Sequence, residues 1–293
     1  MLRRYLRKIT NNEACLGLLL IALSFLVIGG LIFYPVLYNF WLSVNKLGFL
    51  PGTPATFVGL SHYKKVLTDP SFWNSIRTTL VFTVSTVLGS TFVGFLVALL
   101  LNREFRLRGL VRGIVMLPYV APVISLVFAW QYIFHPVYGY FNYLLVDVLK
   151  IIPEPVAWLQ LPRYALAAVI IFDIWRQFPF AFLMILARMQ AIPQELYEAA
   201  DVDGAVGWQK AVYITIPELT FVLGSIILMR AIWNVYKFGE VYLLSRHVNV
   251  LSVYAYEKAF ASYEHGLAAA ITTSIFLMLL GFIILYIRKV LKW

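Results

Sequence analysis

The stretch Gln194–Pro217, QELYEAADVDGAVGWQKAVYITIP, is the longest polar interruption in the second half of the chain, and long apolar runs flank it. Its spacing predicts two short helices joined by a turn. Glu195 and Glu198 fall near the first helix N-terminus, where the helix dipole favours negative charge. Gly204 permits a turn that a residue with a Cβ would resist. Because this amphipathic helix–turn–helix lies between two apolar runs, we interpret it as a docking surface.

The composition of the whole chain is that of an integral membrane protein. Of its 293 residues, 61% are hydrophobic and 13% are charged, whereas a soluble domain carries about 25% charged residues. The net charge of +10 comes from basic residues beside apolar runs, which indicates anchoring at the cytoplasmic face and argues against nucleic-acid binding. The single cysteine excludes an intrachain disulfide. We therefore predict an all-α membrane protein in contact with lipid.

Six apolar segments are candidates for crossing a bilayer core of about 30 Å, which takes roughly 20 helical residues. The fourth segment holds Asp173 and Arg176, and the fifth and weakest holds Arg230. The first segment is too long for the apolar part of a signal peptide and lacks a small-residue cleavage site, so we expect it to be retained. The predicted spans are residues 16–41, 78–101, 113–134, 164–186, 217–237 and 267–287. They give an N-terminus of residues 1–15, a transmembrane domain of residues 16–289, and a polar loop 190–217 between the fourth and fifth spans.

Lysine and arginine collect on one side of this six-span topology. Because positively charged loops stay in the cytoplasm, we predict that this side is cytoplasmic, together with both termini and the Gln194–Pro217 stretch. The chain is thus expected as a multi-pass protein of the cell membrane. The basic residues on this side are Arg3, Arg4, Arg7, Lys8, Arg103, Arg106, Arg108, Arg112, Arg188, Lys210, Arg288, Lys289 and Lys292.

Polar residues inside the spans form a second candidate site, because burying such groups in lipid is costly. Two of them lie four residues apart in the fourth span, and three form one stripe in the fifth. The candidates for lining a hydrophilic path are Gln131, Asp173, Gln177, Arg230, Asn234 and Lys237. The alternative is a structural ion pair in which Asp173 is bonded to Arg176 or Arg230.

A stripe of small residues runs along the second predicted span. Ser90, Gly94 and Ala98 recur every four residues, and such stripes let a neighbouring helix approach closely. The neighbour is either another helix of this chain or a second subunit, and the sequence leaves both open.

Motifs for catalysis are absent from the sequence. It contains no phosphate-binding glycine loop and no HExxH pair, and its four histidines lack the spacing of metal ligands. We therefore predict no enzyme activity, no cofactor and no metal site in this chain.

The polar stretch also carries a motif that resembles the EAA signature of ABC importer permeases. That signature reads EAA, three residues, Gly, nine residues, then I-x-L-P. The chain has Glu198-Ala199-Ala200, Gly204 and Ile214-Thr215-Ile216-Pro217, so that Ile216 replaces the leucine.

Further segments extend this resemblance over nearly the whole chain. Leu117-Pro118 with Ala121-Pro122, Trp175–Phe180 and Met189–Pro193 are similar to the carbohydrate-uptake permeases of the maltose and glycerol-phosphate type. The chain resembles the first of the two paired permeases in these systems. It departs from many of them at Ser245–Asn249, where they have Gly-Gly-Pro, so this outer loop does not inform on the substrate.

The resemblance implies partners and roles that the residues alone do not. A separate cytoplasmic ATPase dimer would bind ATP and Mg²⁺, an extracytoplasmic solute-binding protein would deliver a sugar, and a second permease would complete the path. Alternating access would then move the sugar across. The polar stretch would be the coupling helix that seats in the ATPase. Its coupling residues would be Glu198, Ala199, Ala200, Asp201, Gly204 and Pro217.

The substrate class stays open at this stage. A neutral di- or oligosaccharide is the common cargo of the resembled family, while Arg230 and Lys237 leave room for an anionic solute such as glycerol phosphate. Two competing classes are a stand-alone secondary transporter driven by protons through Asp173 and Arg176, and a membrane enzyme that uses carboxylates of the outer loops.

Overall fold

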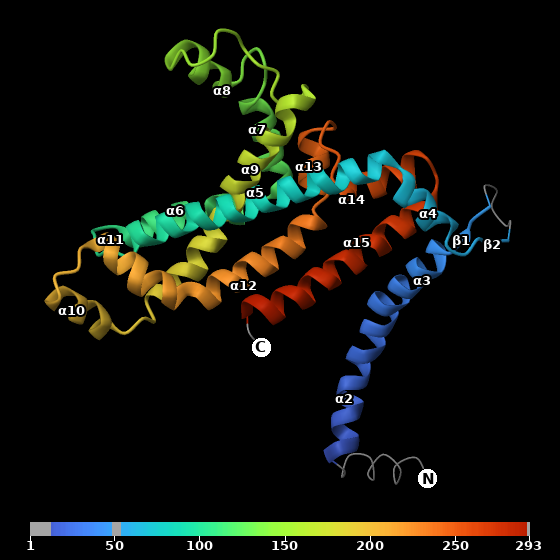
Figure 1. The fold of residues 1–293 in the computed structure, drawn as a ribbon, viewed down its shortest axis with the longest axis horizontal. Coiled ribbons are helices and arrows are strands. Elements are labelled where there is room, and N and C mark those ends of the chain that lie inside the picture. Colours follow the sequence, from blue (N-terminus) through green and yellow to red (C-terminus); the bar gives the residue numbers. More distant parts are fainter. Residues whose placement is uncertain (1–12, 49–53, 292–293) are drawn as a thin grey trace. The chain divides into compact units, whose positions relative to one another are not determined.

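The structure, a computed structural model, describes residues 13–48 and 54–291. Helices make up most of it (Figure 1). Most of the predicted cytoplasmic N-terminus, with Arg3, Arg4, Arg7 and Lys8, lies outside the described residues, as does Lys292. The chain divides into two compact units, residues 1–68 with 255–274 and residues 69–254 with 275–293.

The first unit joins the N-terminal helices to the start of the last long helix. Its elements are α2 (Glu13–Ile28), a π-helical segment (Gly29–Phe33), α3 (Tyr34–Ser43), the short antiparallel strands β1 (Asn45–Lys46) and β2 (Thr56–Phe57), α4 (Ser61–Thr68), a second π-helical segment (Glu257–Ala261) and the first half of α15 (His265–Tyr286). Asn39 of α3 donates to the hydroxyl of Thr273 over 3.2 Å and accepts from that of Thr272 over 3.2 Å. The amide therefore ties α3 to α15.

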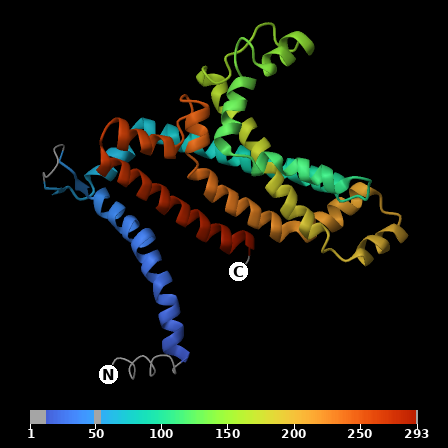
Figure 2. The same cartoon turned by 180° about the vertical axis from the view of Figure 1, so that it is seen from behind.

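The second unit is a bundle of long helices. Its elements are α5 (Pro70–Leu101), α6 (Arg108–Val120), α7 (Val123–Ile133), α8 (Tyr140–Asn142), a π-helical segment (Tyr143–Val148), α9 (Pro162–Met189), α10 (Gln194–Val202), α11 (Gly207–Lys210), a π-helical segment (Ala211–Thr215), α12 (Ile216–Val235), α13 (Gly239–Leu244), most of α14 (Leu251–Tyr256), the second half of α15 and the π-helical segment Ile287–Leu291. Helices α5 and α9 cross in close contact, α12 packs against both, and α6 packs against α9 (Figure 2). Helix α10 lies where α9 ends and α11 begins, at the end of the bundle away from α8 (Figure 1).

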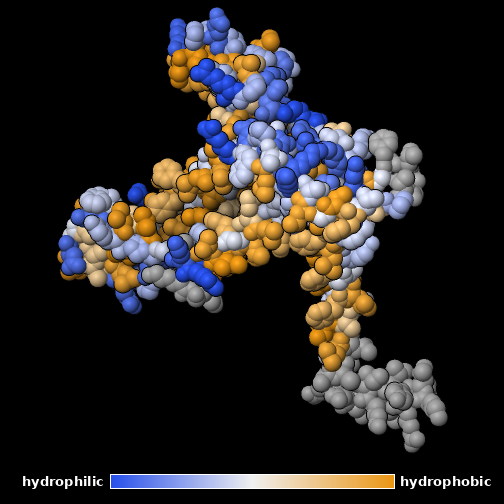
Figure 3. Space-filling view, turned by 45° about the vertical axis from the view of Figure 1, so that its right-hand side comes forward, coloured by the Kyte–Doolittle hydropathy of each residue, from blue (hydrophilic) through white to orange (hydrophobic). Residues whose placement is uncertain are grey.

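Helix α5 buries mainly small and polar side chains, together with Phe72, Phe82, Val87 and Leu101, and exposes many of its other large apolar ones. Its buried residues include Ser90, Gly94 and Ala98, whereas Leu88 and Phe92 are more than half exposed. A helix facing lipid shows this pattern, because in a membrane the interhelical contacts favour small residues and the solvent itself is apolar. Hydrophobic side chains cover much of the helical surface turned toward the viewer in Figure 3.

The stripe of small residues packs inside the chain. A Cβ on Gly94 would come within 2.7 Å of the Cβ of Ala181 and 2.7 Å of the backbone nitrogen of Phe182, both on α9. The absence of that atom lets the backbones of α5 and α9 approach. Of the two readings left open by the sequence, intrachain packing is therefore the one that the structure supports.

Within residues 13–48 and 54–291, five helical stretches could cross a membrane by length and composition, and a sixth results if the bent pair α6 and α7 counts as one span. The predicted third span, residues 113–134, is thus not one helix, because its two halves meet at 92°. Proline disfavours helical geometry in the residue before it, and Ala121, before Pro122, is extended with ψ 148°. Helices occupy most of the other five predicted segments, and several of these helices extend beyond the predicted bounds.

The predicted helix–turn–helix is only partly separate from the fifth span. Helix α10 and the turn at Gly204, with φ +73°, follow the prediction. Helix α11, however, continues through the π-helical segment Ala211–Thr215 into α12, and Gly207–Val235 forms one apolar stretch. Proline has no backbone N–H to donate in a helix, and its ring crowds the preceding turn. The wider π-helical turn before Pro217 leaves room for the ring, so the helix continues through this residue.

Candidate functional site

The turn between α10 and α11 presents the motif residues on its surface. Glu198 and Ala199 are exposed, and a Cβ on Gly204 would have open space around it. Asp201 forms an ion pair with Lys210 across the turn. The hydroxyl oxygens of Tyr197 and Thr215 lie 3.0 Å apart and share a hydrogen bond. These contacts shape the turn. Glu198 itself forms no ion pair within the described part of the chain.

Large apolar side chains surround this turn. Val202 is 89% exposed, Trp208 63% and Tyr213 71%. At the base of the loop, the guanidinium of Arg188 donates to the carboxylate of Glu218 over 2.6 Å and to its backbone carbonyl over 3.2 Å. The loop is therefore held at both ends and offers an apolar surface with acidic groups, which suits contact with another protein.

A buried polar cluster joins α9 to α12 and the turn after it. The ammonium of Lys237 lies 2.6 Å from the carboxylate of Asp173, and the two side chains are 8% and 1% exposed. The amide nitrogen of Gln177 donates to that carboxylate and, over 3.1 Å, to the side-chain oxygen of Asn234. In turn, Arg230 donates to the oxygen of Gln177 over 2.9 Å. Five of the six path candidates from the sequence are thus in one network.

The ion pairs of this cluster are not those expected from the sequence. The suggested pairing of Asp173 with Arg176 or Arg230 is wrong. Instead, Asp173 pairs with Lys237, and Arg176 pairs with Glu240 of α13 over 2.6 Å. The reason is that α12 ends at Val235, two residues before Lys237. The side chain of Lys237 therefore no longer follows the helical stripe of Arg230 and Asn234, and the turn after α12 sets its direction.

Arg230 is surrounded by aromatic rings. Its guanidinium carbon lies 4.2 Å from the ring centre of Phe180, 5.3 Å from that of Trp233 and 5.5 Å from that of Tyr119. The side-chain nitrogen Nη2 of Arg230 and Nδ2 of Asn234 are buried and make no hydrogen bond with any described residue. The Nε of Arg176 is likewise buried without a partner among the described residues, so the cluster retains three unused donors, two of them one turn apart on α12.

Gln131 stands apart from the cluster. Its amide nitrogen donates to the backbone carbonyl of Leu243 over 2.7 Å and so connects α7 to α13. Sequence reasoning missed Glu240 and the three aromatic rings. Helical spacing contained a signal for two of them, because Phe180 follows Gln177 by three residues and Trp233 follows Arg230 by three.

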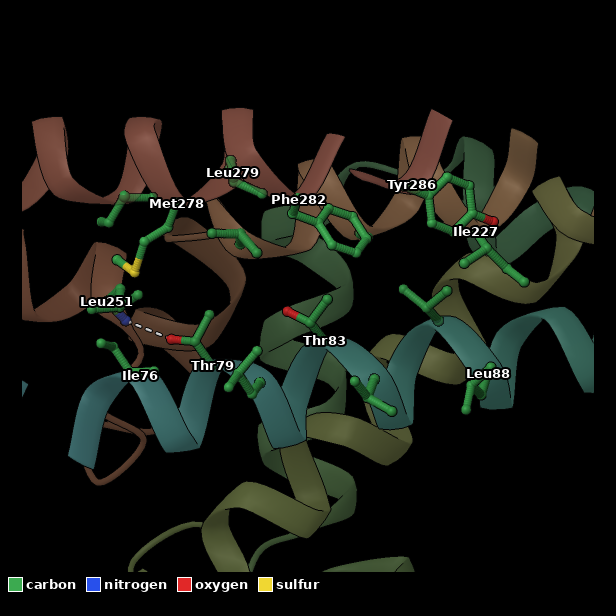
Figure 4. Close-up of a pocket in the computed structure, with 16 residues that line it drawn as sticks. Ile76, Thr79, Thr83, Leu88, Ile227, Leu251, Met278, Leu279, Phe282 and Tyr286 are labelled. Atoms are coloured by element: carbon green, nitrogen blue, oxygen red, sulfur yellow. Dashed lines mark hydrogen bonds between the residues drawn. The ribbon is translucent and has the colours of Figure 1, made fainter. Parts of the chain in front are cut away.

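A separate cavity of about 360 Å³ lies between α5, α12, α14 and the second half of α15 (Figure 4). Its walls are almost wholly apolar, and the hydroxyl of Thr79 accepts a bond from the backbone of Leu251 over 2.8 Å at one side. The hydroxyl of Thr83 is buried without a partner among the described residues. No charged side chain lines this space, so it is distinct from the polar cluster. In the described residues, no group of three or more histidine, cysteine or acidic side chains could hold a metal ion.

Comparison with known proteins identifies the family. Residues 90–292 match the model of the binding-protein-dependent transport system inner membrane component. The chain is 44% identical over 280 residues to the inner membrane ABC transporter permease protein YcjO of Escherichia coli, with 96% of each chain covered. It is 34% identical over 290 residues to the trehalose/maltose transport system permease protein MalF of Thermococcus litoralis, with 96% of this chain and 95% of the relative covered.

Solved structures support the fold. One chain from a bacterial ABC transporter involved in the import of the acidic polysaccharide alginate superposes with a TM-score of 0.77 at 20% identity, over 99% of both chains. The resemblance to ABC importer permeases and the helical membrane fold are therefore confirmed. The chain is a multi-pass membrane protein and belongs to the family of binding-protein-dependent transport system inner membrane components.

Proposed function

We propose that this chain is the permease subunit of an ATP-driven importer that carries a sugar by alternating access. Relatives are named for trehalose and maltose transport and for sulfoquinovosyl glycerol transport, which supports a di- or oligosaccharide or a related solute. A second permease would complete the path, and an extracytoplasmic solute-binding protein would deliver the cargo. Both termini would lie in the cytoplasm. ATP and Mg²⁺ would bind to a separate ATPase dimer, so this chain itself would hold no cofactor and catalyse no reaction.

The surface of α10 and α11 is the single observation that carries this proposal. A polar segment between two membrane helices exposes Val202 and Trp208 beside the carboxylate of Glu198. Exposed apolar side chains outside the membrane mark a contact with another protein. We assign that partner as the ATPase. Ala199 would allow close seating, while Asp201 with its lysine partner and Gly204 would shape the turn.

The continuous helix from Gly207 to Val235 gives this surface a mechanical connection to the spans. A force on α11 would act directly on α12, since no flexible loop separates them at Pro217. The ion pair between Arg188 and Glu218 would transmit the same displacement to the end of α9. Both helices contribute to the polar cluster, which is where we place the substrate path.

The test of the proposal is Glu198→Lys in the complete importer, reconstituted in liposomes with its partner subunits. Reversing an interfacial charge places like charges together or removes a bond to the ATPase. We expect ATP-driven uptake to fall by at least about tenfold, which corresponds to ~1.4 kcal/mol of coupling energy, while the importer still binds the loaded solute-binding protein.

The matched control is Glu104→Lys, which makes the same charge change in the turn between α5 and α6, where Glu104 is 91% exposed. Uptake by this control should match that of the unaltered importer. Normal ATP-coupled uptake by Glu198→Lys would refute the docking role. Uptake that continues when the ATPase partner cannot hydrolyse ATP would instead favour the stand-alone secondary transporter.

A further inference from the structure

We infer that the cargo of this permease carries an anionic group and that Arg230 is the residue that receives it. The inference rests on the proposed function, because it concerns the substrate path of that importer. It starts from the charges of the buried cluster. Three side chains of the cluster are cationic, Arg176, Arg230 and Lys237, and two are acidic, Asp173 and Glu240, which leaves one positive charge in excess.

The excess charge belongs to Arg230. The carboxylate of Asp173 is bonded to Lys237 and to Gln177, and the carboxylate of Glu240 is bonded to Arg176. Among the described residues, Arg230 forms no ion pair, and its hydrogen bond goes to the neutral amide of Gln177. Its side chain is nevertheless buried, with the residue 4% exposed. A buried guanidinium stays charged, and a buried charge normally has a partner of opposite sign.

The aromatic rings explain how Arg230 is stable before any cargo arrives. Phe180, Trp233 and Tyr119 present their rings within 4.2–5.5 Å of the guanidinium, which attracts the cation while its Nη2 donor stays unused. The nitrogen Nη2 is therefore held in place and still free to donate. An arriving anion would not have to displace an existing carboxylate, so its full attraction would contribute to binding.

The donors beside Arg230 fit an anionic group with two or more oxygens. Nδ2 of Asn234 is also unused, and Asn234 follows Arg230 by one helical turn on α12. Carboxylate, sulfonate and phosphate groups accept several bonds at once, and the planar guanidinium matches such groups better than an ammonium does. A neutral sugar could accept these bonds but would leave the positive charge unpaired. The chemistry therefore selects a sugar with an acidic substituent.

The aromatic neighbours of Arg230 are themselves partly exposed. Trp233 is 48% exposed, and Tyr119 and Phe180 are half-buried. The rings thus contact the buried guanidinium and also reach the surface of the bundle. The apolar face of a sugar ring could pack on them while its acidic group reaches the donors.

The experiment measures binding of matched sugar pairs to the full importer in lipid nanodiscs, followed by tryptophan fluorescence. The pairs are trehalose with trehalose 6-phosphate, glucose with glucuronate, and cellobiose with its uronic acid. Because Trp233 adjoins Arg230, its emission should change on binding, and a Trp233→Phe variant identifies its share of the signal. We expect the acidic member of at least one pair to bind at least about tenfold more tightly than its neutral counterpart.

Two variants assign the preference to the residue. Arg230→Gln should abolish the difference between acidic and neutral members, whereas Arg230→Lys should retain part of it because the charge remains. The matched control is Arg163→Gln, which removes an exposed arginine that lies over Tyr164 at the start of α9. This control should keep the full preference. Thermal unfolding of each variant confirms that the fold is intact.

The outcomes separate this inference from the proposed function. If neutral members bind as well as acidic ones, or if Arg230→Gln leaves the preference unchanged, the anionic cargo is refuted and the sugar importer stands. If the importer neither binds nor transports any sugar of either kind, the proposed function fails and the inference fails with it.

Discussion

At the scale of single residues, the buried charges of the cluster determine both stability and selectivity. Asp173 and Lys237 sit in a membrane helix and the turn after a second one, with 1% and 8% of their side chains exposed. Desolvation of two such charges is costly, and the pair offsets that cost only while both members are present. The same holds for Arg176 and Glu240.

We predict that Asp173→Asn destabilises the protein, because it leaves the Lys237 ammonium buried without a carboxylate. Removing one member of a buried pair typically costs about 3–5 kcal/mol. Thermal unfolding of the purified protein, followed by circular dichroism, measures the loss. The double variant Asp173→Asn with Lys237→Met should recover a large part of it. Glu104→Gln, at an exposed pair, is the control and should unfold like the unaltered protein. An unchanged melting temperature for Asp173→Asn would contradict the prediction.

For Asn234→Ala we predict weaker cargo binding with an unchanged fold. The substitution removes the unused donor Nδ2 and the acceptor for Gln177. One hydrogen bond contributes about 1 kcal/mol, so the apparent affinity for the transported solute should fall by roughly fivefold. Concentration-dependent uptake by the reconstituted importer measures this change. Thr220→Ala, an exposed position on the same helix, is the control. Equal affinity and rate in Asn234→Ala would remove this residue from the path.

At the scale of elements, the contact between α5 and α9 organises the second unit. Small residues on α5 let the helices approach, and the bulky side chains of α9 fill the space beside them, including Phe182 and Ile185. The close approach depends on Gly94. Its missing Cβ is what allows the backbone of α9, near Phe178 and Phe182, to pass so near.

We predict that Gly94→Ala forces α5 and α9 apart. Two of the atoms that the new Cβ would meet belong to the backbone, at 2.7 Å and 2.9 Å, and backbone atoms cannot rotate away. Overpacking of this kind costs typically about 1–3 kcal/mol, which a lower melting temperature should report. Gly113→Ala, in α6, meets nothing within 4 Å and should be neutral or slightly stabilising, because alanine favours helices. Equal melting temperatures for the two variants would show that the contact tolerates the added atom.

At the scale of the whole molecule, the sidedness of the loops is the property on which the proposed coupling depends. From the distribution of basic residues, we predict that the loop with α10 lies in the cytoplasm. The segment around α8 would then lie outside. Each of these loops has a strongly exposed valine, Val202 at 89% and Val137 at 85%.

We predict that Val137→Cys reacts with a membrane-impermeant maleimide added to intact cells, and that Val202→Cys reacts only after the membrane is opened. Both variants are made with Cys15→Ser, which removes the single native thiol. Because both positions are exposed in their loops, a difference in labelling reports the side of the membrane. The Cys15→Ser protein without a new cysteine is the control and should not react. Labelling of Val202→Cys from outside would reverse the proposed topology and exclude contact with a cytoplasmic ATPase.

The local properties of this protein could be read from its sequence. Long apolar runs determine which segments enter a membrane, because insertion depends on the hydrophobicity of about 20 consecutive residues. The EAA motif and the turn at Gly204 are likewise short patterns with a local cause. Helical spacing likewise placed Asp173 with Gln177 on one face of the fourth span, and Arg230 with Asn234 on one face of the fifth. The bend at Pro122 could have been anticipated from the same local rules, since a proline within a predicted span is a signal for it.

The tertiary structure alone decided which side chains meet. Lys237 reaches Asp173, and Arg176 reaches Glu240, because α12 ends two residues before Lys237 and a turn redirects the chain. The free donor of Arg230 emerged only once the other charges of the cluster had found partners. Spacing along a helix specifies a face, whereas an ion pair also requires the rotation and crossing of two helices. Those are determined by packing over the whole bundle, so the charge left unpaired could be found only in the folded protein.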